Sequence, residues 1–180
     1  MEPDFFIDRL HVFVYPDRQV LGAQAALMAE TAIVEMLQNK PEINIIFAAA
    51  PSQNEFLSNL AQSEKIDWNR INAYHMDEYI GLADDAPQKF STYLKEHLFD
   101  RVPLKTINLI NSSNPSPEDE CMRYTCLLKS NPPDIVCMGI GENGHIAFND
   151  PHVALFNDTE MVKIVELDKA CRLQQVNDNC

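Results

Sequence analysis

The chain has 180 residues and a formal net charge of -13 at pH 7. This length suits one domain with a proper hydrophobic core, and a single α/β domain spanning residues 1–180 is expected. The acidic balance argues against nucleic acid or an anionic membrane surface as a partner, because both attract proteins with an excess of Lys and Arg.

The five cysteines are odd in number and form no CxxC pair or metal-type spacing, which is typical of reduced structural thiols. The N-terminal residues lack the basic and apolar regions of a signal peptide, and no apolar stretch is expected to reach the roughly 18 residues that a membrane span needs. Together these features predict a cytoplasmic protein with no membrane partner.

Apolar, β-favouring runs alternate with helical segments along the chain. Strands are predicted at Leu10–Tyr15, Ile43–Ala50, Ile71–His75, Ile107–Ile110, Asp134–Ile140 and Met161–Leu167. Helices are predicted at Arg18–Gln38, Pro51–Leu60, Phe90–Phe99 and Ser116–Leu128, with a further helix from Lys169 to Val176. The alternation indicates a doubly wound α/β fold with a mostly parallel sheet. The end at Cys180 has no breaker, which predicts that the last elements of the sheet lie beyond this chain.

Three helix starts carry sequence signals. Asp17 stands before the first helix as a plausible N-cap, and Ser52 with Glu55 has the spacing of a capping box. Pro117 is expected at the first position of the helix that follows Ser116.

In an open α/β sheet, ligands bind where the carboxyl ends of the strands meet the following loops. Three strand ends carry residues that could bind a ligand or transfer a proton. The first contains Ala50, Ser52 and Gln53, where backbone N–H groups and the Ser52 hydroxyl could hold an anion such as a phosphate. An ordinary capped helix is the alternative, because this segment has no glycine or lysine.

The second strand end carries Asp77 and Glu78. A carboxylate at the rim of such a crevice can have its pKa raised by partial burial and then serve as a general base. Solvated turn residues are the alternative interpretation. His75 lies on the strand itself and is expected to be packed in the core.

The third strand end is a glycine loop that contains G-x-G-x-x-G from Gly139 through Gly141 to Gly144. The dinucleotide fingerprint belongs to the first βα turn of its unit and needs an acidic residue about 20 positions later, at a strand end. NAD(H) binding is therefore the minority interpretation. The loop is expected to feed a helix whose N-terminal dipole favours the neutral form of His145.

Neutral His145 and a carboxylate at Asp77 would form a proton-transfer pair. His145 is suited to opening a sugar ring, and Asp77 is suited to moving a proton between adjacent carbons. A metal site built from His75, Asp77, His145 and His152 is conceivable, but no H-E-x-x-H or comparable spacing supports it, so no metal and no cofactor are predicted.

Two segments carry a resemblance to a known family. Met76-Asp-Glu-Tyr-Ile-Gly-Leu82, followed by Gly139-Ile-Gly-Glu-Asn-Gly-His-Ile-Ala-Phe-Asn149, resembles the glucosamine-6-phosphate deaminase (isomerase) family, within the larger group that includes 6-phosphogluconolactonases. The resemblance implies a Rossmann-like fold, a phosphosugar substrate, no cofactor and a homo-oligomer. That family converts glucosamine 6-phosphate to fructose 6-phosphate and ammonia.

Matched by position, the resemblance implies that Asp77 is the base that takes the C2 proton and that His145 opens the ring. Asp150 matches a glutamate that supports the histidine, and Asn143 matches an aspartate among the histidine's partners. Asn143 departs from the family because it carries no negative charge. The expected substrate-binding residues are Ala50, Ser52, Gln53, Glu78, Gly141 and Gly144.

The resulting expectation is a sugar-phosphate aldose–ketose isomerase/deaminase. The family's phosphate loop is replaced by Ala49 to Asn54, and arginines that usually follow the second motif are replaced by Asn157, Asp158 and Glu160. Two alternatives therefore stand beside it: a 6-phosphogluconolactonase-like hydrolase, and a sugar-phosphate-binding protein that kept the fold without turnover.

Overall fold

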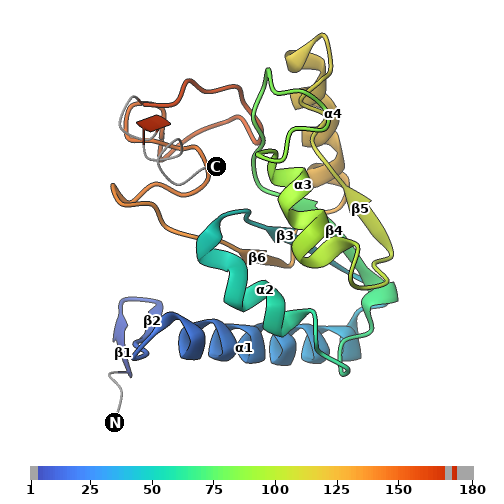
Figure 1. Cartoon of the computed structure of the whole chain (residues 1–180), viewed down its shortest axis with the longest axis vertical. Coiled ribbons are helices and arrows are strands. Elements are labelled where there is room, and N and C mark those ends of the chain that lie inside the picture. Colours follow the sequence, from blue (N-terminus) through green and yellow to red (C-terminus); the bar gives the residue numbers. More distant parts are fainter. Residues whose placement is uncertain (1–3, 169–171, 174–180) are drawn as a thin grey trace.

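The main sheet has four parallel strands in the spatial order β5-β4-β3-β6 (Figure 1). The computed structural model describes residues 4–168 and 172–173. The strands are β3 (Ile43–Phe47), β4 (Ile71–His75), β5 (Thr106–Asn108) and β6 (Ile135–Cys137). In the ladder, Ile43 lies beside Ile71 and Ile45 beside Ile135. The predicted α/β fold with a parallel sheet is confirmed.

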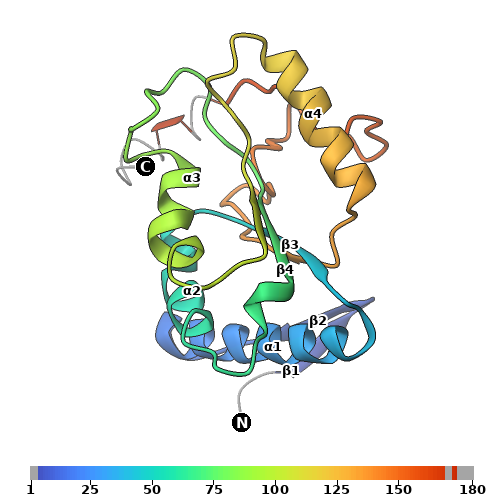
Figure 2. The same cartoon turned by 90° about the vertical axis from the view of Figure 1, so that its right-hand side faces the viewer.

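Helices cover both faces of this sheet (Figure 2). One face packs against α1 (Arg18–Asn39), α2 (Asn54–Leu60) and α3 (Phe90–Leu94), which continues as the π-helical turn η3 (Lys95–Phe99). The other face packs against α4 (Pro117–Ser130).

The order of the strands locates the ligand-binding edge. From β3 the chain moves outward to β4 and then to β5, and it returns through α4 to β6 on the opposite side of β3. The junction between β3 and β6 is therefore the point where the winding direction reverses. Open α/β sheets bind ligands in the crevice outside the carboxyl ends of the strands at such a point.

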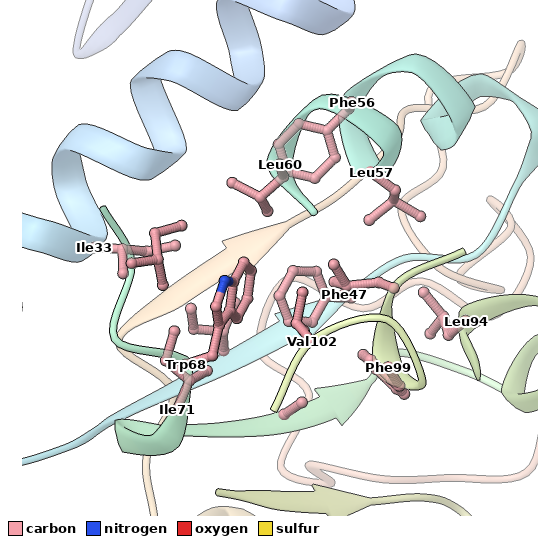
Figure 3. Close-up of a cluster of buried hydrophobic side chains, with 14 of the residues drawn as sticks. Ile33, Phe47, Phe56, Leu57, Leu60, Trp68, Ile71, Leu94, Phe99 and Val102 are labelled. Atoms are coloured by element: carbon pink, nitrogen blue, oxygen red, sulfur yellow. The ribbon is translucent and has the colours of Figure 1, made fainter. Parts of the chain in front are cut away.

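The main core lies between β3, β4 and the three helices of the first face (Figure 3). Alternate residues of β3, namely Ile43, Ile45 and Phe47, are completely buried there, as the period of two along a strand requires. The opposite face carries a smaller cluster of Tyr74, Tyr124 and Leu128. Burying both faces gives strands that read as nearly continuous apolar runs.

Close packing of α1 and α2 depends on Gly22. A Cβ atom at this position would lie 2.4 Å from the Cβ atom of Glu55, so any side chain would force the two helices apart. Asp17 caps α1 as predicted, since its side chain accepts a 2.8 Å hydrogen bond from the Val20 N–H. Among the described helices, α1 is long and apolar enough to cross a membrane, a test that core helices of soluble proteins also pass.

The first predicted strand is shorter than expected and belongs to a different sheet. β2 (Leu10–Phe13) pairs antiparallel with β1 (Asp4–Ile7), an element that the sequence did not reveal. The chain reverses at Asp8, which has a φ of 52°. Two other predicted strands extend too far, to Ala50 and Ile140, because the strands of the sheet end at Phe47 and Cys137.

One further prediction of secondary structure is wrong, and another cannot be compared. Met161–Leu167 forms no strand, because it has no ladder partner; side chains hold it instead, as when Lys163 Nζ donates to the Val153 carbonyl at 2.7 Å. The predicted helix from Lys169 to Val176 lies outside the described residues except for 172–173.

The prediction of a capping box formed by Ser52 and Glu55 is also wrong. Pro51–Gln53 forms the 3-10 turn η1, and the Ser52 hydroxyl accepts from the Gln53 side chain. Glu55 instead pairs with Arg18 at 2.8 Å. The N-terminus of α4 matches its prediction, with Ser116 as N-cap and Pro117 in the first turn.

Candidate active site

A cavity of about 440 Å³ lies at the carboxyl ends of β3, β4 and β6. Six of the residues predicted for the site line it: Ala50, Ser52 and Gln53 after β3, Asp77 after β4, and Gly141 and His145 after β6. Thus all three strand ends singled out in the sequence meet at one edge of the sheet. The remaining predicted residues, Glu78, Asn143, Gly144 and Asp150, are not in its lining.

Asp77 is the titratable group of this cavity whose pKa departs furthest from its ordinary value. Burial raises the pKa of the Asp77 carboxyl to about 7, and the negative charge of Glu78 adds to the effect. A carboxyl group with this pKa gains and loses a proton near neutral pH. It is therefore suited to act as a general base that later returns the proton.

The side chain of Glu78 points toward the first turn of α3. Its Oε1 atom accepts from the N–H groups of Tyr79 and Phe90, both at 3.0 Å, and its Oε2 atom accepts from the Ser91 N–H at 2.9 Å. Burial alone would raise the pKa of Glu78, but the nearby His75 ring and the hydrogen bonds of Ser91 and Tyr79 outweigh it and hold the pKa at about 2. Glu78 therefore caps the first turn of α3 as a carboxylate.

His145 is held by two side chains of its own loop. Its Nδ1 atom lies 2.6 Å from Oδ1 of Asn143 and 3.2 Å from Oδ1 of Asp150. Because an amide oxygen only accepts, this geometry places a proton on Nδ1 and leaves Nε2 of the neutral ring to exchange a proton with a ligand. The two residues thus fix the tautomer of His145.

Asp150 is completely buried. Burial would raise its pKa, but hydrogen bonds from the Asn143 amide and the Asp168 N–H lower the pKa below its ordinary value. The positive charge of a protonated His145 or His152 lowers it further. The Asn143 amide donates to Oδ1 of Asp150 at 3.0 Å. Asp150 is therefore a carboxylate that supports the histidine from outside the cavity.

The glycine loop forms a tight turn beneath the histidine. The Gly141 N–H donates to the His145 carbonyl, and the Gly144 N–H donates to the Gly141 carbonyl, both at 2.9 Å. A Cβ atom on Gly141 would lie 2.2 to 2.6 Å from three atoms of the imidazole ring. Gly144 has a φ of 85°, which favours glycine.

The helix expected after this loop is absent, since residues 141–156 form turns and irregular structure. The prediction that a helix dipole favours neutral His145 is therefore wrong, because no helix begins there. The same finding removes the main feature of the dinucleotide fingerprint, in which the glycine loop opens a helix.

The loop after β3 is positioned by a residue that the sequence did not single out. The hydroxyl of Tyr93, on α3, lies 2.7 Å from the Ala50 carbonyl oxygen and 2.6 Å from Oδ1 of Asn54. Gln53 is buried and its amide reaches the Ser52 hydroxyl at 3.3 Å. Ser52 is exposed and presents its hydroxyl at the mouth of the cavity.

Three aromatic rings join the segments of the site. The ring centroids of Tyr79 and Phe90 lie 4.8 Å apart, those of Tyr79 and Phe148 lie 5.2 Å apart, and those of Phe90 and Phe148 lie 5.5 Å apart. Phe90 and Phe148 also line the cavity. Tyr79 and Phe148 stand inside the two motifs, a signal from which their role could have been suspected.

A larger cavity, of about 830 Å³, lies on the α4 side of the sheet and includes Asp77 and Glu78 in its lining. Its lining includes neither His145 nor the Ala50 to Gln53 loop. The smaller cavity is therefore the better candidate for chemistry that needs both proton-transfer groups.

The described residues contain no group of three His, Cys, Asp or Glu side chains that could hold a metal ion. In particular, the four residues considered for a metal site do not converge. The Nε2 atom of His152 instead lies 2.9 Å from the Glu166 carbonyl oxygen, and His75 is buried in the sheet.

Comparison with known proteins gives a family for this chain. Residues 16–172 match the family model described as glucosamine-6-phosphate isomerases/6-phosphogluconolactonase. A glucosamine-6-phosphate deaminase of Exiguobacterium sp. is 34% identical over 142 residues, which are 79% of this chain and 56% of the relative. One of Bacillus pumilus is 32% identical over 169 residues, 91% of this chain and 67% of the relative.

Solved structures agree with this assignment. A monomeric glucosamine-6-phosphate deaminase superposes with a TM-score of 0.78 and 26% identity, covering 89% of this chain and 66% of that one. A 6-phosphogluconolactonase of Thermotoga maritima gives a TM-score of 0.63 and 25% identity, covering 70% and 58%. The chain thus spans about three fifths of the length of most of these proteins. It belongs to the family of glucosamine-6-phosphate isomerases and 6-phosphogluconolactonases.

Proposed function

We propose that the protein is a sugar-phosphate aldose–ketose isomerase/deaminase that acts on glucosamine 6-phosphate or a closely related phosphosugar. The observation that carries the proposal is the single cavity in which Asp77, His145 and the Ala50 to Gln53 loop meet. Curated relatives at 31 to 34% identity bear the name glucosamine-6-phosphate deaminase, which supports the choice of substrate.

The first step is ring opening at His145. The Nε2 atom takes the proton of the O1 hydroxyl and delivers it to the ring oxygen as the bond between C1 and that oxygen breaks, leaving the open-chain aldehyde. The proton on Nδ1 stays hydrogen-bonded to Asn143, with Asp150 beside it to stabilise the charged ring while it carries the extra proton.

The second step is proton transfer at Asp77. The ionised carboxylate removes the proton from C2 and returns it to C1, while O1 gains a proton and the amine nitrogen gives one up. The aldehyde and its neighbouring amine thereby become a C1 alcohol and a C2 imine. Addition of water to the imine then releases ammonia and leaves the 2-ketose. A carboxyl group whose pKa is about 7 suits both halves of this transfer.

The phosphate is expected at the loop after β3, where the Ser52 hydroxyl and the backbone of the turn lie at the mouth of the cavity. Binding there would place C1 and C2 deeper, beside Asp77. This arrangement uses the binding of a remote group to orient the reacting carbons.

The decisive experiment incubates the purified protein with glucosamine 6-phosphate and measures ammonia and fructose 6-phosphate independently. Equal amounts of both products are expected, and Asp77→Asn is expected to abolish them while the protein stays folded. Absence of both products at high enzyme concentration would contradict the proposal. If glucosamine 6-phosphate then raised the melting temperature, a binding protein without turnover would be favoured.

A lactone hydrolase is the second candidate, because the same fold superposes on a 6-phosphogluconolactonase with a TM-score of 0.63. In that chemistry, Nε2 of His145 would activate a water molecule, and the C2 proton would not move. Hydrolysis of 6-phosphogluconolactone that survives Asp77→Asn and is lost in His145→Asn would favour this candidate.

A homo-oligomer in the cytoplasm remains a prediction. The deaminase with the TM-score of 0.78 is described as monomeric, so a monomer is the alternative outcome. Light scattering coupled to size-exclusion chromatography would determine the assembly of this protein.

A further inference from the structure

The carboxylate of Glu78 joins the Asp77 segment to the first turn of α3. Both of its oxygens are engaged by backbone donors: Oε1 by Tyr79 and Phe90, and Oε2 by Ser91. A carboxylate held by three N–H groups at 2.9 to 3.0 Å has little capacity left for a ligand. Its side chain has no exposed surface.

His75 closes the other side of this carboxylate. Its Nδ1 atom accepts from the Ile110 N–H at 3.5 Å, which places the proton of a neutral ring on Nε2. Nε2 lies 3.7 Å from Oε2 of Glu78, beyond hydrogen-bonding distance, and has no other partner among the described residues. The ring therefore directs a weakly positive edge at Glu78 and shields it from water.

These contacts create a fixed negative charge one residue away from Asp77. Buried like charges on adjacent residues favour the protonated form of one of the two groups. Since Glu78 has three backbone donors, it keeps its charge, and the proton goes to Asp77. The same contacts hold Phe90 in the cavity wall, because Phe90 is one of the donors.

We propose that Glu78 is a positioning residue for Asp77 and not a ligand of the substrate. Its buried carboxylate clamps the Asp77 segment onto α3, and its charge raises the proton affinity of Asp77 to suit proton transfer near neutral pH. The catalytic meaning of this role rests on the proposed function, whereas the electrostatic coupling between the two carboxylates can be measured without any substrate.

The test titrates the Asp77 carboxyl carbon by 13C NMR, with Asp77→Asn used to assign the signal. In Glu78→Gln, which keeps the shape and removes the charge, the midpoint of Asp77 is expected to fall by roughly half a unit or more. In Glu78→Asp, which keeps the charge, the midpoint is expected to stay closer to that of the wild type. Glu78→Met repeats the removal of charge with an apolar side chain.

Glu120→Gln is the matched control. Glu120 is also a buried glutamate, and it accepts a hydrogen bond from the Asn111 N–H at 2.6 Å. It does not contribute to the raised pKa of Asp77. A folded Glu78→Gln protein with an unchanged Asp77 midpoint would overturn the proposal. An equal shift in Glu120→Gln would do the same, because the effect would then be a general consequence of destabilisation.

Activity gives an independent readout where turnover is found. A positioning role predicts that the acid limb of kcat/KM moves to lower pH in Glu78→Gln, in step with the NMR midpoint. A substrate contact predicts a higher KM with an unmoved limb, which would overturn the proposal. If no phosphosugar is converted, the NMR titration still decides the inference, so the two failures are distinguishable.

Discussion

The side-chain amide of Asn143 donates a 3.0 Å hydrogen bond to Oδ1 of the buried Asp150. Its other end, Oδ1, accepts from Nδ1 of His145 at 2.6 Å. An uncharged side chain thus connects the histidine to its carboxylate. A carboxylate at position 143 could accept from His145 but could not donate to Asp150.

Asn143→Asp is therefore expected to destabilise the protein. The substitution removes a donor from a buried carboxylate and adds a like charge beside it, so the free energy of unfolding at pH 7 should fall by about 1–3 kcal/mol. Urea unfolding measures this change, with the exposed neighbour Asn149→Asp as control. Equal stability of the two variants would mean that the hydrogen bond to Asp150 contributes little.

The pH dependence of activity should follow Asp77. Only the ionised carboxylate removes the C2 proton, and the Asp77 pKa is about 7. The value of kcat/KM is therefore expected to rise with pH through a midpoint near 7 and to fall about tenfold per pH unit well below it. A pH profile with its acid limb near 4 would show that an ordinary carboxyl group, and not this one, controls the reaction.

Asp77 should also cost stability at neutral pH. The pKa is raised from 3.8 in the unfolded chain to about 7 in the folded protein, so between these values the folded state binds more protons. The contribution of Asp77 to stability is thus highest below about pH 4 and is lost as the pH rises through about 7. Asp77→Asn should raise the free energy of unfolding by more at pH 8 than at pH 4, by at most ~4 kcal/mol. A gain that is the same at both pH values would contradict this linkage.

The elements that could be predicted are those whose signals are local. β3 and β4 are short apolar runs between turn residues, and Asp17 and Ser116 cap the helices that follow them. The meeting of the three strand ends follows from the parallel sheet, since carboxyl ends of parallel strands share one edge. Asp77 and His145 could therefore be brought together from the sequence alone.

The features that were missed depend on contacts that the local sequence does not signal, and for Glu78 these contacts are with distant residues. Glu78 accepts from Phe90 and Ser91, which lie 12 and 13 positions later, so its capping role has no local signal. The missing helix after the glycine loop has a local cause, because the hydrogen bond from the Gly141 N–H to the His145 carbonyl closes a turn instead. Strand β1 exists only through its pairing with β2.

Tyr93→Phe is expected to weaken the loop that would bind the phosphate. The hydroxyl connects α3 to the Ala50 carbonyl and to Asn54, and its loss should cost about 1 kcal/mol of stability. Because the loop would position the phosphate and not the reacting carbons, KM should rise several-fold while kcat changes little. Steady-state kinetics separate the two parameters, and a fall in kcat with an unchanged KM would contradict this assignment.

Gly141→Ala tests whether the position of the imidazole ring controls activity. The new Cβ atom would overlap three ring atoms at 2.2 to 2.6 Å, so the ring must leave its place between Gly141 and Asn143. Misplacing a catalytic group by about 1 Å can cost roughly 100-fold in rate, and a loss of this order in kcat is expected. The fold should persist, because the altered contact lies in an irregular loop.

Gly139→Ala provides the comparison within the same loop. A Cβ atom there would lie 3.4 Å from the Gln53 amide nitrogen and 3.7 Å from the Ser52 hydroxyl oxygen, ordinary contact distances with side-chain atoms. Its effect on kcat should therefore be far smaller than that of Gly141→Ala. Similar losses in both variants, with melting temperatures near that of the wild type, would show that the flexibility of the loop matters more than the space that Gly141 leaves for His145.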